Sequence, residues 1–271
     1  MTIDKITLGT VNKIDLDLIK AEYFPKEIVK RNFKIYRFDH SDHNHVMIKT
    51  FPPALEIATS YVEINPRTFG SYQKAIDFLK TIIVDFDIND GHKISRLDLC
   101  VDVYGYPLEY FKDCCNIKHK RHQEVYVSSS KSLVYGKPPQ RITIYERDKR
   151  DPSLKDQVVT RVESQCRGDK LPIHRLGQAE QLINHNPFEK IYFLQTDYNY
   201  TEIKNRREAK NFAYLKRLVE QYGINDARRI INKDGHFARD YEKFLIRVNE
   251  PDLFALYQTS IKKLLDGFEM A

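Results

Sequence analysis

The chain has 271 residues, of which 41% are hydrophobic, so it is long enough to bury the core of one large or two small domains and too apolar to be disordered. No stretch reaches the ~20 apolar residues of a membrane span. The N-terminus carries no signal pattern and the four cysteines form no CxxC pair, so we expect a cytoplasmic protein with no membrane partner, disulfide framework or structural zinc.

Alternating polar and apolar residues predict strands through the first two-thirds of the chain, with helical spacing between some of them. The predicted strands are 6–11, 33–39, 46–51, 60–66, 95–105, 124–130, 140–148 and 158–166, and the predicted helices are 15–24, 68–86 and 108–117. From about residue 170 the spacing predicts helices at 208–223, 225–233, 238–248 and 251–268. We therefore predict an α+β fold, with a central, mainly antiparallel sheet that has helices on one face, followed by a helical C-terminal part.

Basic residues gather in two segments of a chain whose formal net charge is +6 at pH 7. Residues 116–150 hold nine Lys or Arg against three acids, and residues 204–217 read "KNRREAKNFAYLKR". A solvated surface explains either segment alone, but two such segments favour a polyanionic partner.

Four of the predicted strands place apolar side chains on one face and charged or tyrosine side chains on the other, by the period of two that strands impose. In "SRLDLCVDVYG", residues 95–105, Arg96 and Asp98 oppose Leu97 and Leu99. If the strands share one sheet, a single polar surface collects Glu63, Arg96, Asp98, Asp102, Tyr145, Arg161 and Glu163. A solvated face explains any one strand, but four carboxylates and two arginines together favour a site.

Clustered carboxylates repel one another unless a cation or an arginine lies among them. Oxygen-rich clusters suit Mg²⁺ or Mn²⁺. A divalent cation beside a tyrosine on a basic protein indicates phosphoryl chemistry, in which the cation polarises a phosphodiester and the tyrosine hydroxyl attacks it. The sequence therefore predicts a phosphodiester site with Mg²⁺ or Mn²⁺ as its cofactor.

The same residues carry a resemblance to a known family. "YVEINP", "SRLDLCVD", "ITIYERDKR" and "TRVES" follow one another over roughly residues 58–168. In this pattern the chain resembles the rolling-circle replication initiators of small plasmids, of the Rep_trans or replication initiation factor type, which include some relaxases of mobile elements. The resemblance implies an RRM-like or ferredoxin-like nicking domain.

Carried over position by position, the resemblance implies Tyr145 as the nucleophile and places Arg96 and Arg161 at the family's arginine positions. The family's acidic positions, which imply metal ligands, match Asp98, Glu163, Glu63 and Asp102. We expect Asp98 and Glu163 to bind the metal first and Glu63 next, whereas Asp102 either joins them or orients Arg96.

The chain departs from the family pattern at two places. "YVSSSKS" lacks the usual glycine, and Glu146 and Arg147 follow the tyrosine where the family has Asn or Asp and then Lys. Three residues therefore remain candidates for the one that holds the phosphate: Lys131, Arg147 and Lys149. We assign Lys149 to catalysis.

The resemblance implies a rolling-circle initiator that nicks an origin, leaves a 5′-phosphotyrosine link and a free 3′-OH, and rejoins the strand without ATP. It also implies a single-stranded or hairpin nick site, a host helicase and polymerase as partners, and a possible homodimer. The alternatives are a relaxase or phage initiator with the same chemistry, a non-catalytic DNA-binding regulator on the same scaffold, and a metal-dependent phosphodiesterase that uses water.

We divide the chain into a catalytic nicking domain at residues 1–170 and a helical DNA-recognition region at residues 171–271. Basic side chains in both parts are expected to contact DNA, and phosphate contacts by such residues add affinity without sequence information. The predicted DNA-binding residues are Lys131, Arg141, Arg147, Arg206, Arg207, Lys210 and Arg217.

Overall fold

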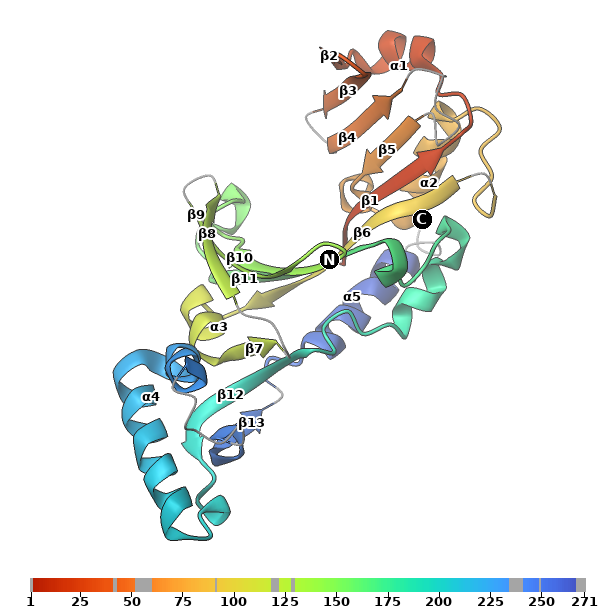
Figure 1. The fold of residues 1–271 in the computed structure, drawn as a ribbon. Helices are drawn as coiled ribbons and strands as arrows, with labels where there is room; N and C mark the ends of the chain where they lie inside the picture. The colour runs from red at the N-terminus through yellow and green to blue at the C-terminus, as the bar shows by residue number, and fades with distance from the viewer. Residues whose placement is uncertain are drawn as a thin grey trace.

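A computed structural model describes residues 2–40, 43–51, 60–90, 92–117, 122–127, 130–233, 241–248 and 250–266. Within these residues the chain forms a large, strongly twisted sheet of ten strands and a smaller sheet of three (Figure 1). The order in the large sheet is β2-β3-β4-β5-β1-β6-β11-β10-β9-β8, and every described pair in it is antiparallel.

The strands of the large sheet are β1 (Ile3–Thr10), β2 (Lys26–Lys30), β3 (Phe33–His40), β4 (His43–Thr50), β5 (Ser60–Ile64), β6 (His92–Tyr104), β8 (His122–Val127), β9 (Ser130–Lys137), β10 (Gln140–Glu146) and β11 (Val159–Arg167). The small sheet, in the order β13-β12-β7, consists of β7 (Cys115–Ile117), β12 (Ile191–Tyr198) and β13 (Leu245–Val248). The α-helices are α1 (Leu16–Tyr23), α2 (Tyr72–Ile82), α3 (Leu108–Cys114), α4 (Arg206–Lys233) and α5 (Leu253–Asp266). Short 3₁₀ helices are η1 (Pro66–Phe69), η2 (Pro152–Leu154), η3 (Gly168–Lys170), η4 (Leu176–Ile183), η5 (Tyr200–Glu202) and η6 (Tyr241–Phe244).

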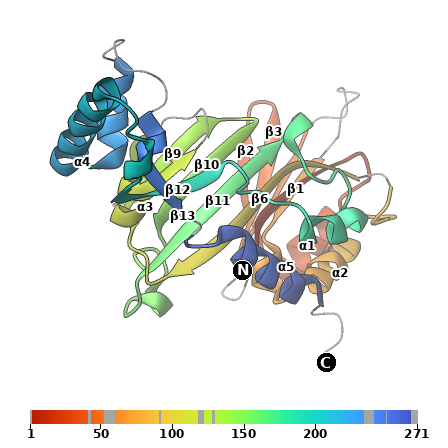
Figure 2. The same ribbon diagram turned by 90° about the horizontal axis from the view of Figure 1, so that it is seen from below.

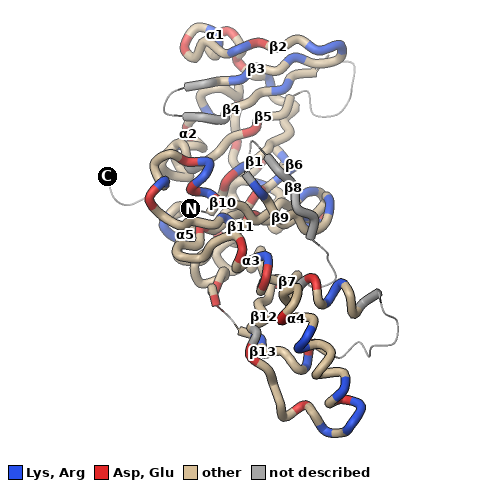
Figure 3. Tube along the Cα trace, turned by 90° about the vertical axis from the view of Figure 1, so that its left-hand side faces the viewer, with Lys and Arg blue, Asp and Glu red and all other residues tan. Residues whose placement is uncertain are grey.

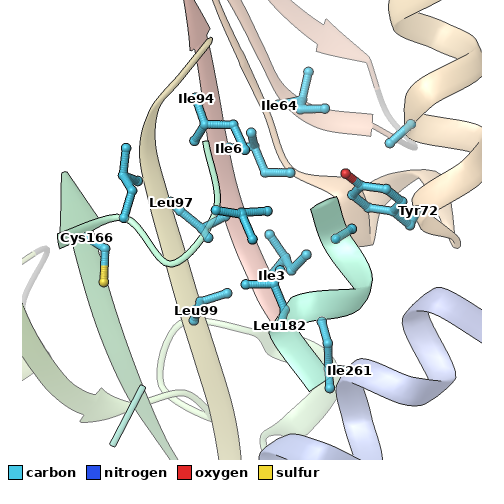
Figure 4. Packing of buried hydrophobic residues seen from close by; sticks show 14 of the residues in the cluster. Ile3, Ile6, Ile64, Tyr72, Ile94, Leu97, Leu99, Cys166, Leu182 and Ile261 are labelled. Atoms are coloured by element: carbon cyan, nitrogen blue, oxygen red, sulfur yellow. The ribbon is translucent and has the colours of Figure 1, made fainter. Parts of the chain in front are cut away.

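Helices cover the apolar face of the large sheet (Figure 2). Helix α2 begins at Ser71, whose hydroxyl accepts a hydrogen bond from the Lys74 backbone N–H, and it buries an apolar stripe against the sheet. Leu97 and Leu99 of β6 meet Ile261 of α5 in the same core (Figure 4). The predicted α+β fold, with a mainly antiparallel sheet and helices on one face, is confirmed.

A second core joins α4 to the small sheet. Phe212, Leu215 and Ile224 of α4 pack with Leu194 of β12 and Phe244. Gly223 has a φ of 75° and separates two helical segments within α4, at the break between the predicted helices 208–223 and 225–233. The C-terminal part is therefore helical around a short sheet.

Two elements of this part differ from the sequence prediction. β12 was not predicted, and the predicted helix at 238–248 is instead η6 followed by β13 in its described residues. Ile246 and Val248 are β-branched and pair with β12, so the strand depends on a partner that is distant in sequence. Among the described helices, none is both long and apolar enough to cross a membrane.

Candidate active site

The residues predicted to share a polar surface do lie on one face of the large sheet, in cross-strand rows. In the first row, Tyr145 of β10 pairs with Arg161 of β11, which pairs with Asp102 of β6. In the next row, Thr143 pairs with Glu163, which pairs with Cys100. Because paired residues of adjacent strands point to the same face, Tyr145 and Glu163 belong to neighbouring rows of one surface.

The surface continues across β6, β1 and β5. Asp98 pairs with Gln165 on one side and with Lys5 of β1 on the other. One row further, Thr7 of β1 pairs with both Arg96 and Glu63. The register therefore brings Glu63, Arg96, Asp98, Asp102, Tyr145, Arg161 and Glu163 onto one surface, as the sequence predicted.

Arg161 is fully buried under this surface and is neutralised by two carboxylates. Its Nε and Nη2 donate to the Asp102 carboxylate at 2.6 and 2.7 Å, and its Nη1 donates to Asp4 Oδ1 at 2.7 Å. The register of β1 shifts between Ile3 and Lys5, and this irregularity contains Asp4. Sequence reasoning missed Asp4, because strand periodicity does not reveal an irregularity that appears only when β1 pairs with β6.

A second arginine, Arg96, lies against Asp98. Its Nε donates to Asp98 Oδ1 at 2.9 Å and its Nη2 bonds to Oδ2, while the Gln165 amide contacts both residues. Burial raises the pKa of Asp98 more than Arg96 lowers it. Glu63 pairs with Lys5, whose Nζ lies 2.8 Å from Oε1, so this carboxylate is already compensated.

Glu163 differs from the other acids because its carboxylate makes no hydrogen bond or ion pair with any described residue. Burial raises its pKa to about 7, and the negative charges of Asp98 and Asp4 add to the rise. Glu163 is thus the acid of the cluster whose charge no described side chain compensates by direct contact.

The arrangement of the carboxylates decides whether this surface could bind the predicted divalent cation. Nowhere in the described residues do three or more His, Cys, Asp or Glu side chains group closely enough to hold a metal ion. Glu63 is committed to Lys5 and Asp102 to Arg161. Mg²⁺ is commonly held by only one or two carboxylates, with water and phosphate oxygens completing its shell. Asp98 is likewise paired with Arg96, so of these four acids only Glu163 is without an ion-pair partner in the described part of the chain. A cation in a site of that open kind would be held by Glu163, and Asp98 could join it only while sharing its charge with Arg96.

Tyr145 is 8% exposed, and its ring lies under a guanidinium. The Cζ atom of Arg150 is 3.9 Å from the ring centroid, and Arg150 Nη2 donates to Ser132 Oγ at 2.8 Å. Burial raises the pKa of the Tyr145 hydroxyl, and the positive charge of Arg161 opposes this rise. Sequence reasoning missed Arg150, whose only signal was its place in the basic segment five residues after the tyrosine.

The basic candidates near Tyr145 fall into different positions. Lys149 is exposed, with its Nζ 2.6 Å from Oε1 of Glu146, whose side chain leaves β10 on the face opposite Tyr145. Arg147 donates from Nη2 to Asp151 at 2.6 Å. Arg141 lies on the polar face opposite Gln165, and its buried Nε has no hydrogen-bond partner among the described atoms. Arg141 and Arg150 are therefore better placed than Lys149 to meet an anion on this face.

The remaining basic candidates lie outside the rows around Tyr145. Lys131 is half-buried near the start of β9. Four others are exposed on α4, which packs on the small sheet rather than the large one (Figure 3); they are Arg206, Arg207, Lys210 and Arg217. The fold thus separates them from the polar face.

No family model matches the chain, and no curated protein sequence matches it. Among solved structures, the chain is similar to the one titled "Structure of Rolling Circle Replication Initiator Protein from Geobacillus stearothermophilus". The two chains are 16% identical, with a TM-score of 0.44, and the match covers 77% of this chain and 89% of the other. This is a distant structural likeness to a rolling-circle replication initiator.

Proposed function

We propose that this protein is a rolling-circle replication initiator that nicks and rejoins DNA through Tyr145. One observation carries the proposal: a tyrosine whose hydroxyl bonds to no described residue shares a cross-strand row with the buried Arg161 and neighbours the acids Glu163 and Asp98. Three of the four sequence motifs that resemble the initiator family supply these side chains, and the fourth, "YVEINP", adds Glu63 on the same surface.

In the proposed reaction, the Tyr145 oxygen attacks the phosphorus of the scissile phosphodiester. The bond from phosphorus to the 3′ oxygen breaks, the 3′ oxygen takes up a proton from water, and the tyrosine loses its proton to water. The protein then carries the 5′ end as a phosphotyrosine, and attack by a 3′-OH reverses the step. The number of phosphoester bonds is unchanged, so rejoining needs no ATP.

The residues of the polar face have separable tasks in this proposal. Arg161 favours the phenolate by its charge, and it stays in place because Asp102 and Asp4 hold it. Arg150 and Arg141 offer guanidinium groups to the phosphate oxygens. Asp98 and Glu163 would hold Mg²⁺ or Mn²⁺, whose chemistry when bound is to polarise the phosphodiester.

The proposal extends to the partners implied by the sequence resemblance. The substrate is a replication origin with a single-stranded or hairpin nick site, read by the region 171–271, and a host helicase and polymerase extend the free 3′-OH. A homodimer is part of the same proposal. Relaxases and phage initiators with this chemistry give the same outcome in the test below.

The test uses single-stranded DNA that carries the origin of the parent replicon, labelled at the 5′ or the 3′ end. It is incubated with Mn²⁺ or Mg²⁺ and analysed on a denaturing gel beside Tyr145→Phe. The wild type is expected to cleave and to form a covalent band with the 3′-labelled DNA, and the variant is expected to lose both. Tyr104→Phe, in an exposed tyrosine at the end of β6, is the matched control and should keep both.

Two outcomes would contradict the proposal. Cleavage that survives in Tyr145→Phe without any covalent band would identify a phosphodiesterase that uses water. Binding without cleavage in both metals would identify a non-catalytic regulator.

A further inference from the structure

Three aromatic side chains lie together on the large sheet, on strands remote from Tyr145. They are Phe33 of β3, Phe51 directly after β4 and Tyr61 of β5. The ring centroids of Phe33 and Phe51 are 5.8 Å apart, and those of Phe51 and Tyr61 are also 5.8 Å apart. We call these three side chains the aromatic patch.

The aromatic patch is on the same face of the sheet as the candidate active site. Tyr61 is two residues before Glu63 on β5, so both point to the polar face, while Val62 between them is fully buried in the core. Lys49 of β4 pairs with Tyr61, and the neighbouring Ile48 is likewise in the core. All three rings are only partly buried.

Positive charge surrounds the patch. The Lys49 ammonium lies 3.8 Å from the ring centroid of Phe33 and 4.8 Å from that of Phe51. Lys30 of β2 pairs with Phe33, and Lys26 pairs with Arg37 on the same face. Figure 3 shows Lys and Arg along β2 and β3, at this end of the large sheet.

The patch is continuous with the active site through the sheet. Tyr61 pairs with Gly9 of β1, which pairs with Lys93 of β6, so no side chain stands between Tyr61 and Lys93 in that row. β5 lies four strand positions from β10 in the sheet order, which at about 4.8 Å per position is roughly 19 Å across the strands. The row of Tyr61 and Lys93 also lies nine residues along β6 from the row of Tyr145 and Asp102, which at about 3.3 Å per residue is roughly 30 Å along the strands. A single strand that leaves Tyr145 therefore has to run along β6 as well as across the sheet to reach the patch.

We propose that the aromatic patch binds the bases of single-stranded DNA that flanks the nick, an assignment that rests on the proposed nicking function. Partly exposed rings beside lysines are the combination with which proteins bind single strands, because every base offers a flat face to stack on and every phosphate a charge to neutralise. In the free protein the Lys49 ammonium makes cation–π contacts with the rings of Phe33 and Phe51. When a base stacks on these rings, the ammonium binds a phosphate of the DNA instead.

Cross-strand stabilisation is the other role that such a row of rings can have, since aromatic pairs on adjacent strands stabilise a sheet. That role predicts a loss of stability when a ring is removed, with DNA binding unchanged. The two roles are therefore separated by measuring binding to bases rather than stability.

The experiment measures fluorescence anisotropy of the full chain with two labelled probes of equal length and charge: oligothymidylate, and an abasic deoxyribose-phosphate strand. The wild type is expected to prefer oligothymidylate. Tyr61→Leu and Phe51→Leu should each weaken oligothymidylate binding roughly five- to a hundredfold, the range for loss of one stacked base, and leave the abasic strand almost unchanged. Phe24→Leu, at a phenylalanine that is 83% exposed outside the patch, is the matched control and should bind like the wild type.

Two results would overturn the inference: wild-type affinity for oligothymidylate in both patch variants, or an equal loss for both probes. If a leucine variant fails to fold, Lys49→Gln supplies the second arm, because it keeps the rings and should weaken binding of both probes. Tyr145→Phe should retain the preference for bases. If the wild-type protein prefers oligothymidylate but never nicks DNA, the proposed nicking function is wrong, whereas the assignment of the aromatic patch to base binding is supported.

Discussion

Arg161 has the largest fully buried side chain in the described part of the chain, and its burial constrains the residues around it. A buried guanidinium is tolerated only when carboxylates and hydrogen bonds replace its water. Asp102 and Asp4 do this from two different strands, so Arg161 holds β11, β6 and the start of β1 in a fixed relation. Its guanidinium is thereby fixed in the row beside Tyr145, where its charge opposes the rise that burial causes in the pKa of the tyrosine.

Glu163 gives a prediction at the same scale, because its pKa is raised to about 7 in the folded protein. The folded state then binds a proton more tightly than the unfolded chain, so stability falls as pH rises from about 4.5 to 7 and the penalty is complete above that range. Glu163→Gln removes the penalty. We expect the variant to be more stable than the wild type at pH 8 without metal, by at most about 3 kcal/mol, and equal to it near pH 4.

Urea denaturation in EDTA at the two pH values measures this difference. Added Mg²⁺ should then raise the midpoint of the wild type at pH 8 and leave that of Glu163→Gln unchanged, because a ligand stabilises only the state that binds it. Equal midpoints of the two proteins at pH 8 in EDTA would contradict the raised pKa.

At the scale of elements, α5 joins the C-terminal part to the large sheet. Ile261 and Tyr257 are fully buried in the core that β1, β6 and α2 form, although more than 150 residues separate them from these strands in sequence.

Ile261→Ala is expected to destabilise the protein by about 2–5 kcal/mol, through lost burial and a cavity. Urea denaturation checks this value, with Leu256→Ala at an exposed site of the same helix as the control, expected within about 0.5 kcal/mol of the wild type. A midpoint unchanged by Ile261→Ala would show that α5 is dispensable for the core.

Elements with a strong period were predictable from sequence, and those that depend on distant partners were not. The strands that contain Glu63, Asp98, Tyr145 and Glu163 alternate polar and apolar residues regularly. The sequence therefore predicted that these side chains share one polar face, on the condition that the strands form one sheet, which they do. The sequences of β12 and β13 do not alternate polar and apolar residues clearly enough to stand out from the neighbouring helical segments. The irregularity at Asp4 arises only when β1 pairs with β6. The position of Arg150 over Tyr145 depends on the turn after β10, which side-chain periodicity does not describe.

At the scale of the whole molecule, basic side chains occupy two surfaces that the fold keeps apart. One is the polar face of the large sheet, and the other is the exposed side of α4 on the second core. A duplex origin and a single-stranded nick site are different ligands, and two separate surfaces allow one chain to hold both. The proposed division at residue 170 assigns recognition to the second surface, although α5 also completes the first core.

This division predicts a change in the salt dependence of origin binding. Each phosphate contact contributes a slope of about −0.9 to the plot of log K against log salt for duplex DNA, because counterions are released. Replacing Arg206, Arg207 and Lys210 together by Gln should therefore reduce the magnitude of the slope by roughly 2–3 if all three contact phosphates. The measurement is an anisotropy titration of duplex origin DNA from low to moderate salt.

The control triple variant replaces Lys74, Lys262 and Lys263, which are exposed on α2 and α5, and removes the same charge from the helical side of the large sheet. An equal change of slope in both variants would mean that net charge alone attracts the duplex, and an unchanged slope in the α4 variant would remove α4 from the interface.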